Sequence, residues 1–371
     1  MIPILDLKEQ YRNLREQMRS AVEGVFESGV FINGPNVKAL ESEIAAYVGA
    51  EHGIGLNSGT DALHLALRAL DIGPGDEVIT TPFTFVATTE AIGIVGATPV
   101  FVDVDPHTYN IDPAQIEAAI TPRTRAIIPV HLYGQPAPME EIASIARKHG
   151  VAIVEDCAQS IGAKIGDPFT GTFGQFGAFS FFPSKNLGAY GDAGMLVTND
   201  AALAARVRSL RGHGGRVKYY HEELGVNSRL DEVQAAILRV KLPHLETWID
   251  RRRQAAARYE PLLAPLRIQL PVQTPGTRHV YHQYTVRVPE RDAVQEHLRG
   301  AGVQTMIYYP VPLHLQAVHA ALNLREGSFP HSESLARDVL SLPMYPELSA
   351  ADQQTVASAL ESALAACGVA A

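Results

Sequence analysis

Strand-like and helix-like segments alternate along most of this chain, and that alternation constrains its fold more than any other feature. Apolar, strand-like runs occupy residues 53–56, 77–80, 99–104, 126–130, 151–154 and 194–198. Helical patterns are predicted over residues 7–28, 36–48, 62–70, 112–119, 139–149, 201–210 and 231–241. Strands that alternate with helices in this way form a mainly parallel sheet covered on both faces. The chain is therefore predicted to be an α/β protein.

The amino-acid composition of the chain changes after the last of these helices. Residues 262–275 are rich in proline and irregular, and strands are predicted afterwards at 284–288 and 303–308, with helices at 291–299 and 350–367. Boundaries between domains fall where such composition shifts occur. We therefore predict a large domain over residues 1–245 and a small C-terminal α+β domain over residues 246–371.

Charge and composition exclude several classes of partner. The net charge of −9 argues against a nonspecific nucleic-acid surface. The two cysteines, Cys157 and Cys367, form no disulfide framework and fit a reducing cytoplasm. No apolar run reaches the roughly 18 residues of a membrane span, and charges interrupt residues 1–18, so neither a membrane partner nor a signal peptide is expected.

One lysine stands where a nucleophile is expected. Lys185 follows the aromatic run at residues 178–182 and precedes a turn that contains Gly188, Gly191 and Gly194. Apolar neighbours lower the pKa of a lysine and release the free amine that forms a Schiff base. The alternative is a side chain that reaches from a strand end to water, and the segment by itself does not decide between the two.

Three further positions follow predicted strands, and each has two interpretations. Ser58, Gly59 and Thr60 form a polar turn before a helix, which binds an anion or merely caps the helix; in isolation the cap is favoured. Phe85 stacks on a planar ring or packs in the core. Asp156 pairs with a ring nitrogen, binds a metal or ribose, or caps a helix; because the nearby histidines lack ligand spacing, no metal is expected.

Two later stretches also stand out. Basic side chains gather between Arg206 and Arg229, and they form either a solvated surface or a site for an anionic substrate. The loop from Tyr308 to His314 is rich in tyrosine and proline. It either contacts a hydroxyl-rich ligand or turns over the core.

Together these positions specify one cofactor. A phosphate-binding turn, an aromatic ring, a carboxylate and a lysine come from successive strand ends of one predicted sheet. Pyridoxal 5'-phosphate (PLP) needs each of these parts, since it carries a phosphate, a ring nitrogen and an aldehyde that a lysine binds. Lys185 would then also carry a proton between the substrate and the cofactor.

Over essentially its whole length, the chain resembles the DegT/DnrJ/EryC1/StrS family of sugar aminotransferases, which are PLP enzymes of fold type I. The resemblance rests on six segments in order, at residues 57–63, 81–85, 155–159, 180–185, 225–236 and 309–314. It implies a seven-stranded, mainly parallel sheet between helices and a small C-terminal domain. It also implies transfer of an amino group from L-glutamate to a UDP- or dTDP-linked keto-sugar, with the pyridoxamine form (PMP) as an intermediate form, in amino-sugar biosynthesis for cell-surface polysaccharides or secondary metabolites.

The resemblance assigns roles residue by residue. The turn at Ser58, Gly59 and Thr60 would bind the cofactor phosphate together with Ser180. Phe85 would stack on the ring, Asp156 would pair with its nitrogen, Gln159 would contact its hydroxyl and Lys185 would form the Schiff base. Asn227 would reach the phosphate of the other subunit in a homodimer with shared sites. The residues expected near the sugar nucleotide are Arg229, Tyr308, Tyr309 and His314.

Two alternatives to this function remain at this point. Some relatives are dehydratases that use PMP and carry a histidine in place of the lysine, which Lys185 argues against. Others have been regarded as regulatory or sensory proteins, which would keep the fold without catalysis.

Overall fold

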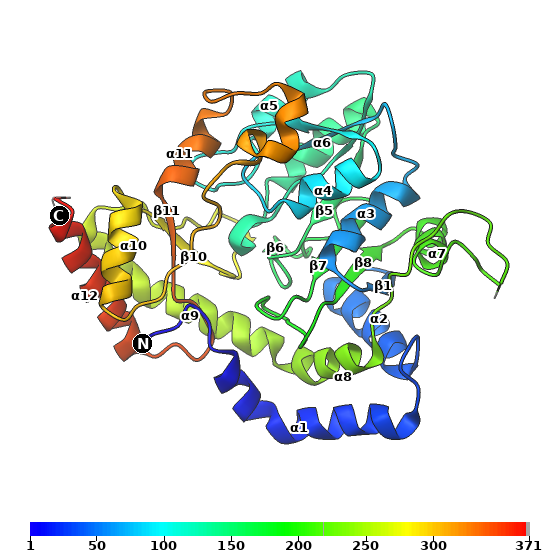
Figure 1. Ribbon diagram of the computed structural model, residues 1–371, viewed down its shortest axis with the longest axis horizontal. Helices are drawn as coiled ribbons and strands as arrows, with labels where there is room; N and C mark the ends of the chain where they lie inside the picture. Colours follow the sequence, from blue (N-terminus) through cyan, green and yellow to red (C-terminus); the bar gives the residue numbers. More distant parts are fainter. Residues whose placement is uncertain (218, 369–371) are drawn as a thin grey trace.

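A computed structural model describes residues 1–217 and 219–368 of the chain (Figure 1). Lys218, a member of the predicted basic stretch, and residues 369–371 lie outside the described residues. Among the helices of the described residues, none combines the length and the apolar character that a membrane span needs.

A seven-stranded sheet forms the centre of the larger part of the molecule. Its strands lie in the order β1-β8-β7-β5-β4-β2-β3, and β8 runs antiparallel to both of its neighbours while the other neighbouring pairs are parallel. This confirms the predicted mainly parallel α/β sheet. The strand bounds are β1 His52–Leu56, β2 Glu77–Thr80, β3 Thr98–Phe101, β4 Thr124–Ile127, β5 Ala152–Asp156, β7 Phe176–Ser180 and β8 Gly194–Thr198.

Helices cover both faces of this sheet, because successive side chains of each strand point to opposite sides. Val78 and Val154 pack in one core with helices α3, α4 and α7, whereas Ile79 and Ile153 pack on the other face with α5 and α6. Helices α2 and α8 cover the β7–β8 side of that second face. The bounds are α2 Pro35–Val48, α3 Gly59–Ala69, α4 Ala87–Ile94, α5 Pro113–Ala119, α6 Met139–His149, α7 Ala201–Leu210 and α8 Glu232–Lys241.

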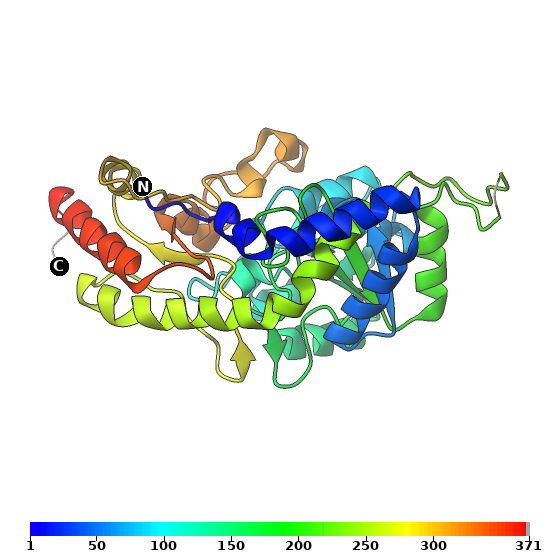
Figure 2. The same ribbon diagram turned by 90° about the horizontal axis from the view of Figure 1, so that it is seen from below.

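The first helix, α1 (Leu7–Ser28), lies outside this layer and runs beside α8 (Figures 1 and 2). Its buried Leu14 and Met18 pack against Ile237 of α8 and against Trp248. The predicted bounds of this helix agree with the structure.

A long helix, α9 (Leu245–Leu263), connects the sheet to a second core. Leu245 and Ile249 near its start pack with α2 and the sheet, whereas Tyr259 and Leu263 near its end pack with the C-terminal elements. Residues 2 and 5 also pack against this second core, so the N-terminal end of the chain lies there (Figure 1). A domain division at residue 245 stays a prediction, since α9 contributes to both cores.

The second core is built from an antiparallel strand pair and from helices α9, α10 and α12. Strands β10 and β11 pair, whereas α11 precedes β11 and packs with Phe83 and Tyr133 in a separate cluster. The bounds are β10 Tyr284–Arg287, β11 Val339–Leu342, α10 Arg291–Gly300, α11 Pro330–Asp338 and α12 Ala350–Ala366; a small separate pair is formed by β6 Lys164–Ile165 and β9 Thr277–Arg278. Short 3-10 helices lie at Leu132–Gly134, Leu242–His244, Ala264–Leu266, Leu313–Leu315 and Ala317–Leu322.

The strand predicted over residues 303–308 is wrong. Only isolated bridges form there, between Val303 and Ile2 and between Met306 and Ser341. Two different partners each meet the segment at one residue, so no continuous ladder of hydrogen bonds develops. Helix α11 and strand β11 were not predicted.

Candidate active site

The predicted cofactor residues meet at one edge of the sheet. Asp156 ends β5, Ser180 ends the neighbouring β7, and Gly59 begins α3 directly after β1. In open α/β sheets, ligands bind beyond the carboxyl ends of the strands. The fold therefore brings these groups to the edge where a ligand is expected.

Asp156 is a buried carboxylate with neutral hydrogen-bond donors. Its Oδ2 accepts from the Thr88 hydroxyl at 2.9 Å and its Oδ1 accepts from the backbone N–H of Ala158 at 3.1 Å. Burial raises the pKa of Asp156, because the charged form loses hydration. The two donors and the nearby Lys185 ammonium oppose that rise. A protonated ring nitrogen beside this carboxylate would supply further compensation for its charge.

Lys185 lies just beyond the end of β7 and is partly buried. Burial lowers the pKa of Lys185 to about 8, and the negative charge of Asp156 limits that decrease. A lysine with such a pKa exists partly as the free amine near neutral pH, which is the form that attacks an aldehyde. The structure thus brings Lys185 and Asp156 into the same electrostatic environment, as predicted.

The turn at residues 58–60 is packed closely against the ends of β7 and β8. Ser58 caps α3, since its Oγ accepts from the N–H of Asp61 at 3.1 Å, which confirms the capping interpretation. A Cβ atom on Gly59 would lie 2.6 Å from the Cβ of Ser180, and one on Gly194 would lie 2.3 Å from the backbone of Ser58. The first N–H groups of a helix have no partner within the helix. With the hydroxyls of Thr60 and Ser180, these N–H groups form a donor set suited to a phosphate.

Phe85 and Tyr309 provide aromatic rings at the same site. Phe85 is 55% exposed, so the core-packing alternative is wrong for this residue, whereas its neighbour Phe83 is fully buried. The rings of Phe85 and Tyr309 lie 5.9 Å apart between centroids. An exposed aromatic face at a strand end suits a planar ligand ring, although the stacking itself stays a prediction.

Gln159 connects these rings to the loop after β4. Its Nε2 donates to the Tyr309 hydroxyl at 3.2 Å, and its Oε1 accepts from the N–H of Tyr133 at 2.6 Å. The hydroxyl of Tyr133 donates to the carbonyl oxygen of Tyr308. Two of the four predicted substrate residues, Tyr308 and Tyr309, therefore lie beside the predicted cofactor residues.

The other predicted ligand residues are placed differently. Arg229 has a buried Nε without a hydrogen-bond partner among the described residues, so the N–H at this atom is available to a ligand. The side chain of Asn227 is exposed, and its backbone bridges to Gly212. His314 is buried and its Nε2 lies 3.0 Å from Glu333. His314 is thus outside the hydrogen-bonded group around Gln159, and its role stays a prediction.

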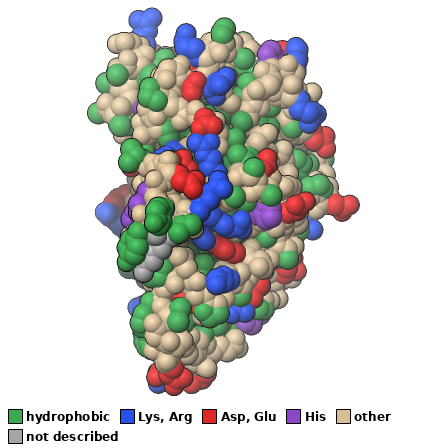
Figure 3. Space-filling view, turned by 90° about the vertical axis from the view of Figure 1, so that its right-hand side faces the viewer, with side chains coloured by type: hydrophobic (Ala, Val, Ile, Leu, Met, Phe, Trp, Pro, Cys, Tyr) green, Lys and Arg blue, Asp and Glu red, His purple; other side chains and the backbone are tan. Residues whose placement is uncertain are grey.

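Most of the basic stretch serves the fold. Arg206 binds Asp71 and the carbonyl oxygen of Ala69, and Arg211 binds Glu41. On the face that carries α7, basic side chains form a band in which acidic groups are interspersed (Figure 3). For Arg206 and Arg211 these contacts favour the surface interpretation over a site for an anionic substrate, and Arg229 is the member best placed for a ligand.

Sequence reasoning missed Thr88, which contacts Asp156, and His282, which lies near Lys185. No local pattern marks the Thr88 hydroxyl as a donor to Asp156, which lies 68 residues later in the chain. His282 is buried, its Nδ1 lies 3.2 Å from the side-chain oxygen of Asn186, and burial together with the Lys185 charge lowers its pKa. It is nearly 100 residues away from Lys185 in the chain, and no local pattern connects the two.

A buried cluster beneath Asp156 contains His131, Glu155 and Cys157, which are residue types that bind metals. His131 Nδ1 accepts from the N–H of Ala137, and its Nε2 lies 3.0 Å from Glu155. Glu155 also accepts from the backbone N–H groups of residues 171, 173 and 174. These bonds give the His131 and Glu155 side chains a structural role, since Glu155 holds the loop before β7 against β5.

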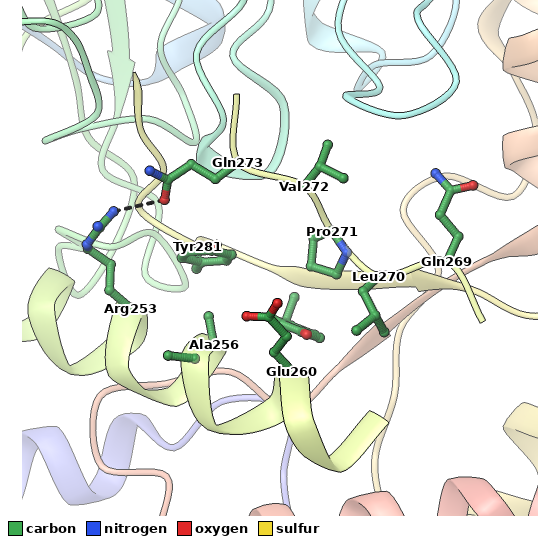
Figure 4. A pocket seen from close by; sticks show the side chains of 11 residues that line it. Arg253, Ala256, Glu260, Gln269, Leu270, Pro271, Val272, Gln273 and Tyr281 are labelled. Carbon is green, nitrogen blue, oxygen red and sulfur yellow. Dashed lines mark hydrogen bonds between the residues drawn. The ribbon is translucent and has the colours of Figure 1, made fainter. Parts of the chain in front are cut away.

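A groove of about 510 Å³ lies elsewhere, between α9 and residues 269–273 (Figure 4). Arg253 and Glu260 point toward it from α9, and Arg253 donates to Gln273. None of the predicted site residues lines this groove. We therefore place the candidate active site at the strand ends.

Comparison with known proteins identifies the family of the chain. Residues 12–361 match the model of the DegT/DnrJ/EryC1/StrS aminotransferase family. The chain is 54% identical to a pleiotropic regulatory protein of Geobacillus stearothermophilus, with 96% of each chain covered. It is 53% identical to UDP-N-acetyl-3-dehydro-alpha-D-glucosamine 3-aminotransferase of Acidithiobacillus ferrooxidans, with 94% of each covered.

A solved structure extends the likeness to three dimensions. The crystal structure of DesV from S. venezuelae in complex with a ketimine intermediate superimposes with a TM-score of 0.95. It is 48% identical, and the alignment covers 97% of this chain and 98% of that one. The chain belongs to the DegT/DnrJ/EryC1/StrS aminotransferase family.

Proposed function

We propose that this protein transfers an amino group from L-glutamate to a keto-sugar linked to a nucleoside diphosphate, with PLP as its cofactor. The observation that carries the proposal is the pairing of Lys185, whose pKa is lowered to about 8, with the buried carboxylate of Asp156 at the strand ends. An amine and an ion-pairing carboxylate are the two groups that a pyridine aldehyde needs from its protein.

The residues present fit this cofactor. Gly59 leaves space that a Cβ would fill against Ser180, and the N-terminus of α3 directs N–H groups toward that space. Ser58, Thr60 and Ser180 would hold the phosphate, Phe85 and Gln159 would contact the ring, and Asp156 would pair with its nitrogen. When bound, the cofactor supplies an electron sink that makes a proton on the neighbouring amino-bearing carbon acidic.

Lys185 would have two tasks in this reaction. As the free amine it would hold the aldehyde group of the cofactor, and burial makes that form accessible near neutral pH. With an amine substrate in the site, its Nζ would take the proton from the substrate carbon and return it on the other side of the amino nitrogen. Thr88 keeps the Asp156 carboxylate in place and ionised through its hydroxyl donor.

The sugar-nucleotide substrate is inferred from relatives and from Arg229. One relative is named a UDP-N-acetyl-3-dehydro-alpha-D-glucosamine 3-aminotransferase, so a 3-keto sugar is a reasonable first test. A buried guanidinium N–H without an acceptor of its own suits an anionic diphosphate. Tyr308 and Tyr309 would lie against the sugar.

We also propose a homodimer whose two subunits share the active sites. The Asn227 side chain is exposed instead of contacting its own subunit's site, which supports a role toward a second copy. Large apolar side chains are also exposed at the end of α1 and after β7, namely Phe26, Phe31 and Phe182. Both cysteines are unpaired, which supports the cytoplasmic location that we propose.

Mixing two inactive variants tests the shared site. Lys185→Ala removes the amine, and Asn227→Ala removes the group predicted to act in the other subunit. Random mixing makes about half of the dimers hybrid, each with one intact site, so about a quarter of wild-type activity should return. No recovery after verified subunit exchange would refute the shared site.

One relative is named a pleiotropic regulatory protein, so the regulatory alternative needs a direct test. The lysine, carboxylate and phosphate-binding turn are all present in this chain, which favours catalysis. The test is to reduce the PLP-loaded protein with borohydride and to locate the cofactor by peptide mass spectrometry. We expect it on Lys185, and we expect Lys148→Ala, a change at an exposed lysine, to leave this labelling unchanged.

Turnover is then measured with L-glutamate and a panel of UDP- and dTDP-linked 3-keto and 4-keto sugars. The expected result is amino-sugar formation with at least one of them and none with the Lys185→Ala variant. Full activity of Lys185→Ala would refute the mechanism. Labelling of Lys185 without turnover on any keto-sugar would refute the substrate class and favour the regulatory alternative.

A further inference from the structure

A buried lysine next to the candidate site has no counter-ion among the residues that the structure describes. Lys241, at the end of α8, is fully buried, its Nζ donates to the carbonyl oxygen of Gly188 at 2.6 Å, and the ammonium lies 4.0 Å from the ring centroid of Tyr190. Burial lowers the pKa of Lys241 to about 7, because the charged form loses its hydration. A buried charge without an ionic partner is destabilising, so its presence calls for an explanation.

Both partners of Lys241 belong to the segment that follows Lys185. This turn, residues 186–191, is also held by Gln234 of α8, whose Oε1 accepts from the N–H of Tyr190 at 2.9 Å. A Cβ on Gly188 would lie 2.4 Å from the carbonyl oxygen of Pro183, so the turn folds tightly back on the residues before Lys185. Lys241 and Gln234 therefore attach to one side of this turn from a single helix.

Helix α8 is a firm support for such an attachment. Glu232 in its first turn accepts from the backbone N–H groups of Asn36 and Val37 at the start of α2. Ala235 and Leu238 are buried in the core between α8 and the sheet. A contact from α8 thus fixes the turn relative to the sheet that carries Asp156.

We propose that Lys241 is a positioning residue that holds the turn 186–191 so that the Lys185 amine stays beside Asp156. A long side chain with a terminal donor is needed, because the Gly188 carbonyl oxygen must be reached from the far end of α8. The ring of Tyr190 partly replaces the lost hydration of the ammonium. This inference rests on the proposed function, because Lys241 affects catalysis only through the position of Lys185.

The test replaces Lys241 with methionine, which keeps an unbranched apolar chain but cannot donate a hydrogen bond. In the cofactor-free protein, Lys185 is modified with acetic anhydride across a range of pH, and its acetylation is followed by peptide mass spectrometry. The midpoint of this profile reports the pKa of Lys185 without any need for turnover. We expect the midpoint to rise in Lys241→Met, because a loosened turn lets Lys185 regain hydration.

Turnover provides the second measurement. A displaced Lys185 amine slows proton transfer, so we expect kcat to fall at least about tenfold while KM for L-glutamate changes less than about threefold. The matched control is Lys164→Met, which removes another lysine from an aromatic ring, that of Phe169, at 4.1 Å. This control should leave both the Lys185 profile and kcat unchanged.

A second variant covers the case in which Lys241→Met does not fold. Gln234→Leu removes the hydrogen bonds to Tyr190 from the same helix, and it should shift the Lys185 profile in the same direction. Unchanged profiles and unchanged kcat in a folded Lys241→Met variant, or in Gln234→Leu if the first does not fold, would overturn the positioning role. If wild-type protein does not attach PLP at Lys185, the proposed function itself fails, and the two failures are therefore distinguishable.

Discussion

Replacing Thr88 with valine tests how the buried carboxylate at the site is stabilised. Valine has nearly the same shape as threonine but lacks the hydroxyl that donates to Asp156 Oδ2 at 2.9 Å. Ala158 N–H would remain as a donor to the other carboxylate oxygen. The substitution therefore removes one of the two neutral hydrogen bonds that oppose the rise of the Asp156 pKa.

The size of the effect follows from the charge of the acceptor. A hydrogen bond to a charged group contributes about 1.5–3 kcal/mol, against about 0.5–1.5 kcal/mol for a neutral one. A loss of about 1.4 kcal/mol from the ionised form would raise the Asp156 pKa by about one further unit. We therefore expect Thr88→Val to lower the free energy of unfolding at pH 7 by about 1.5–3 kcal/mol.

The sign of the pH dependence is also determined. Because the pKa of Asp156 is raised in the folded state, the folded protein binds a proton more readily than the unfolded chain, and stability falls as pH rises through that interval. Thr88→Val should make this fall steeper. At a pH low enough to protonate Asp156, the variant should lose only neutral hydrogen bonds, to Asp156 and to the Thr84 hydroxyl.

Thermal unfolding of the cofactor-free protein, from mildly alkaline pH down to a pH that protonates Asp156, measures this effect. The matched control is Thr89→Val on the same helix, since the buried Thr89 hydroxyl donates to the carbonyl oxygen of Val86 and contacts His319 instead of a carboxylate. Thr88→Val should unfold at a lower temperature than the control at pH 7, and the gap should close as the pH falls. A gap that is absent, or constant over this pH range, would refute the assigned stabilisation of Asp156.

Three other predictions concern ligand binding. Gly59→Ala would place a Cβ 2.6 Å from the Cβ of Ser180, so the PLP affinity measured by fluorescence should fall at least about tenfold. The control Gly73→Ala, whose Cβ has ordinary clearance, should bind PLP normally, and equal affinities of the two variants would contradict phosphate binding by this turn. The rate at which PLP attaches to Lys185 in stopped-flow measurements should rise roughly fivefold from pH 7 to pH 8, because the pKa of about 8 governs the free amine, and a flat profile would contradict it. Arg229→Gln should raise KM for the nucleotide sugar at least about tenfold without changing the half-reaction with L-glutamate, and equal losses in both half-reactions would contradict a substrate role.

The local sequence pattern was sufficient to predict most strands of the sheet and the residues at its ligand-binding edge. Hydrophobic periodicity predicted most of the elements from α1 to α8, because most of these strands are short and apolar and most of these helices bury one face. The same reasoning placed Lys185, Asp156 and the turn at residues 58–60 at strand ends, where a parallel sheet brings them together. The strand predicted at 303–308 failed because strand formation there depends on distant partners, Ile2 and Ser341, that meet it at single residues.

For single residues, burial and the hydrogen-bond partners in the structure decide between the two interpretations that the sequence allows. Phe85 is exposed, although an isolated phenylalanine is usually a core residue, because the turn after β2 directs it outward beside Tyr309. The arginines at 206 and 211 are occupied by Asp71 and Glu41, which lie more than 100 residues earlier in the chain. No spacing rule connects such pairs.

The alternation of strands and helices in the large sheet, the lysine and carboxylate at its strand ends, and the family resemblance could all be recognised in the sequence. The pKa values and hydrogen-bond partners of those groups became known from the packed structure alone. Thr88 reaches Asp156 across 68 positions of the chain, and Lys241 reaches the turn after Lys185 across 53. The physical reason is that desolvation and hydrogen bonding depend on the packed surroundings of a group, which many segments build together, whereas periodicity and turn chemistry are written within a few neighbouring residues.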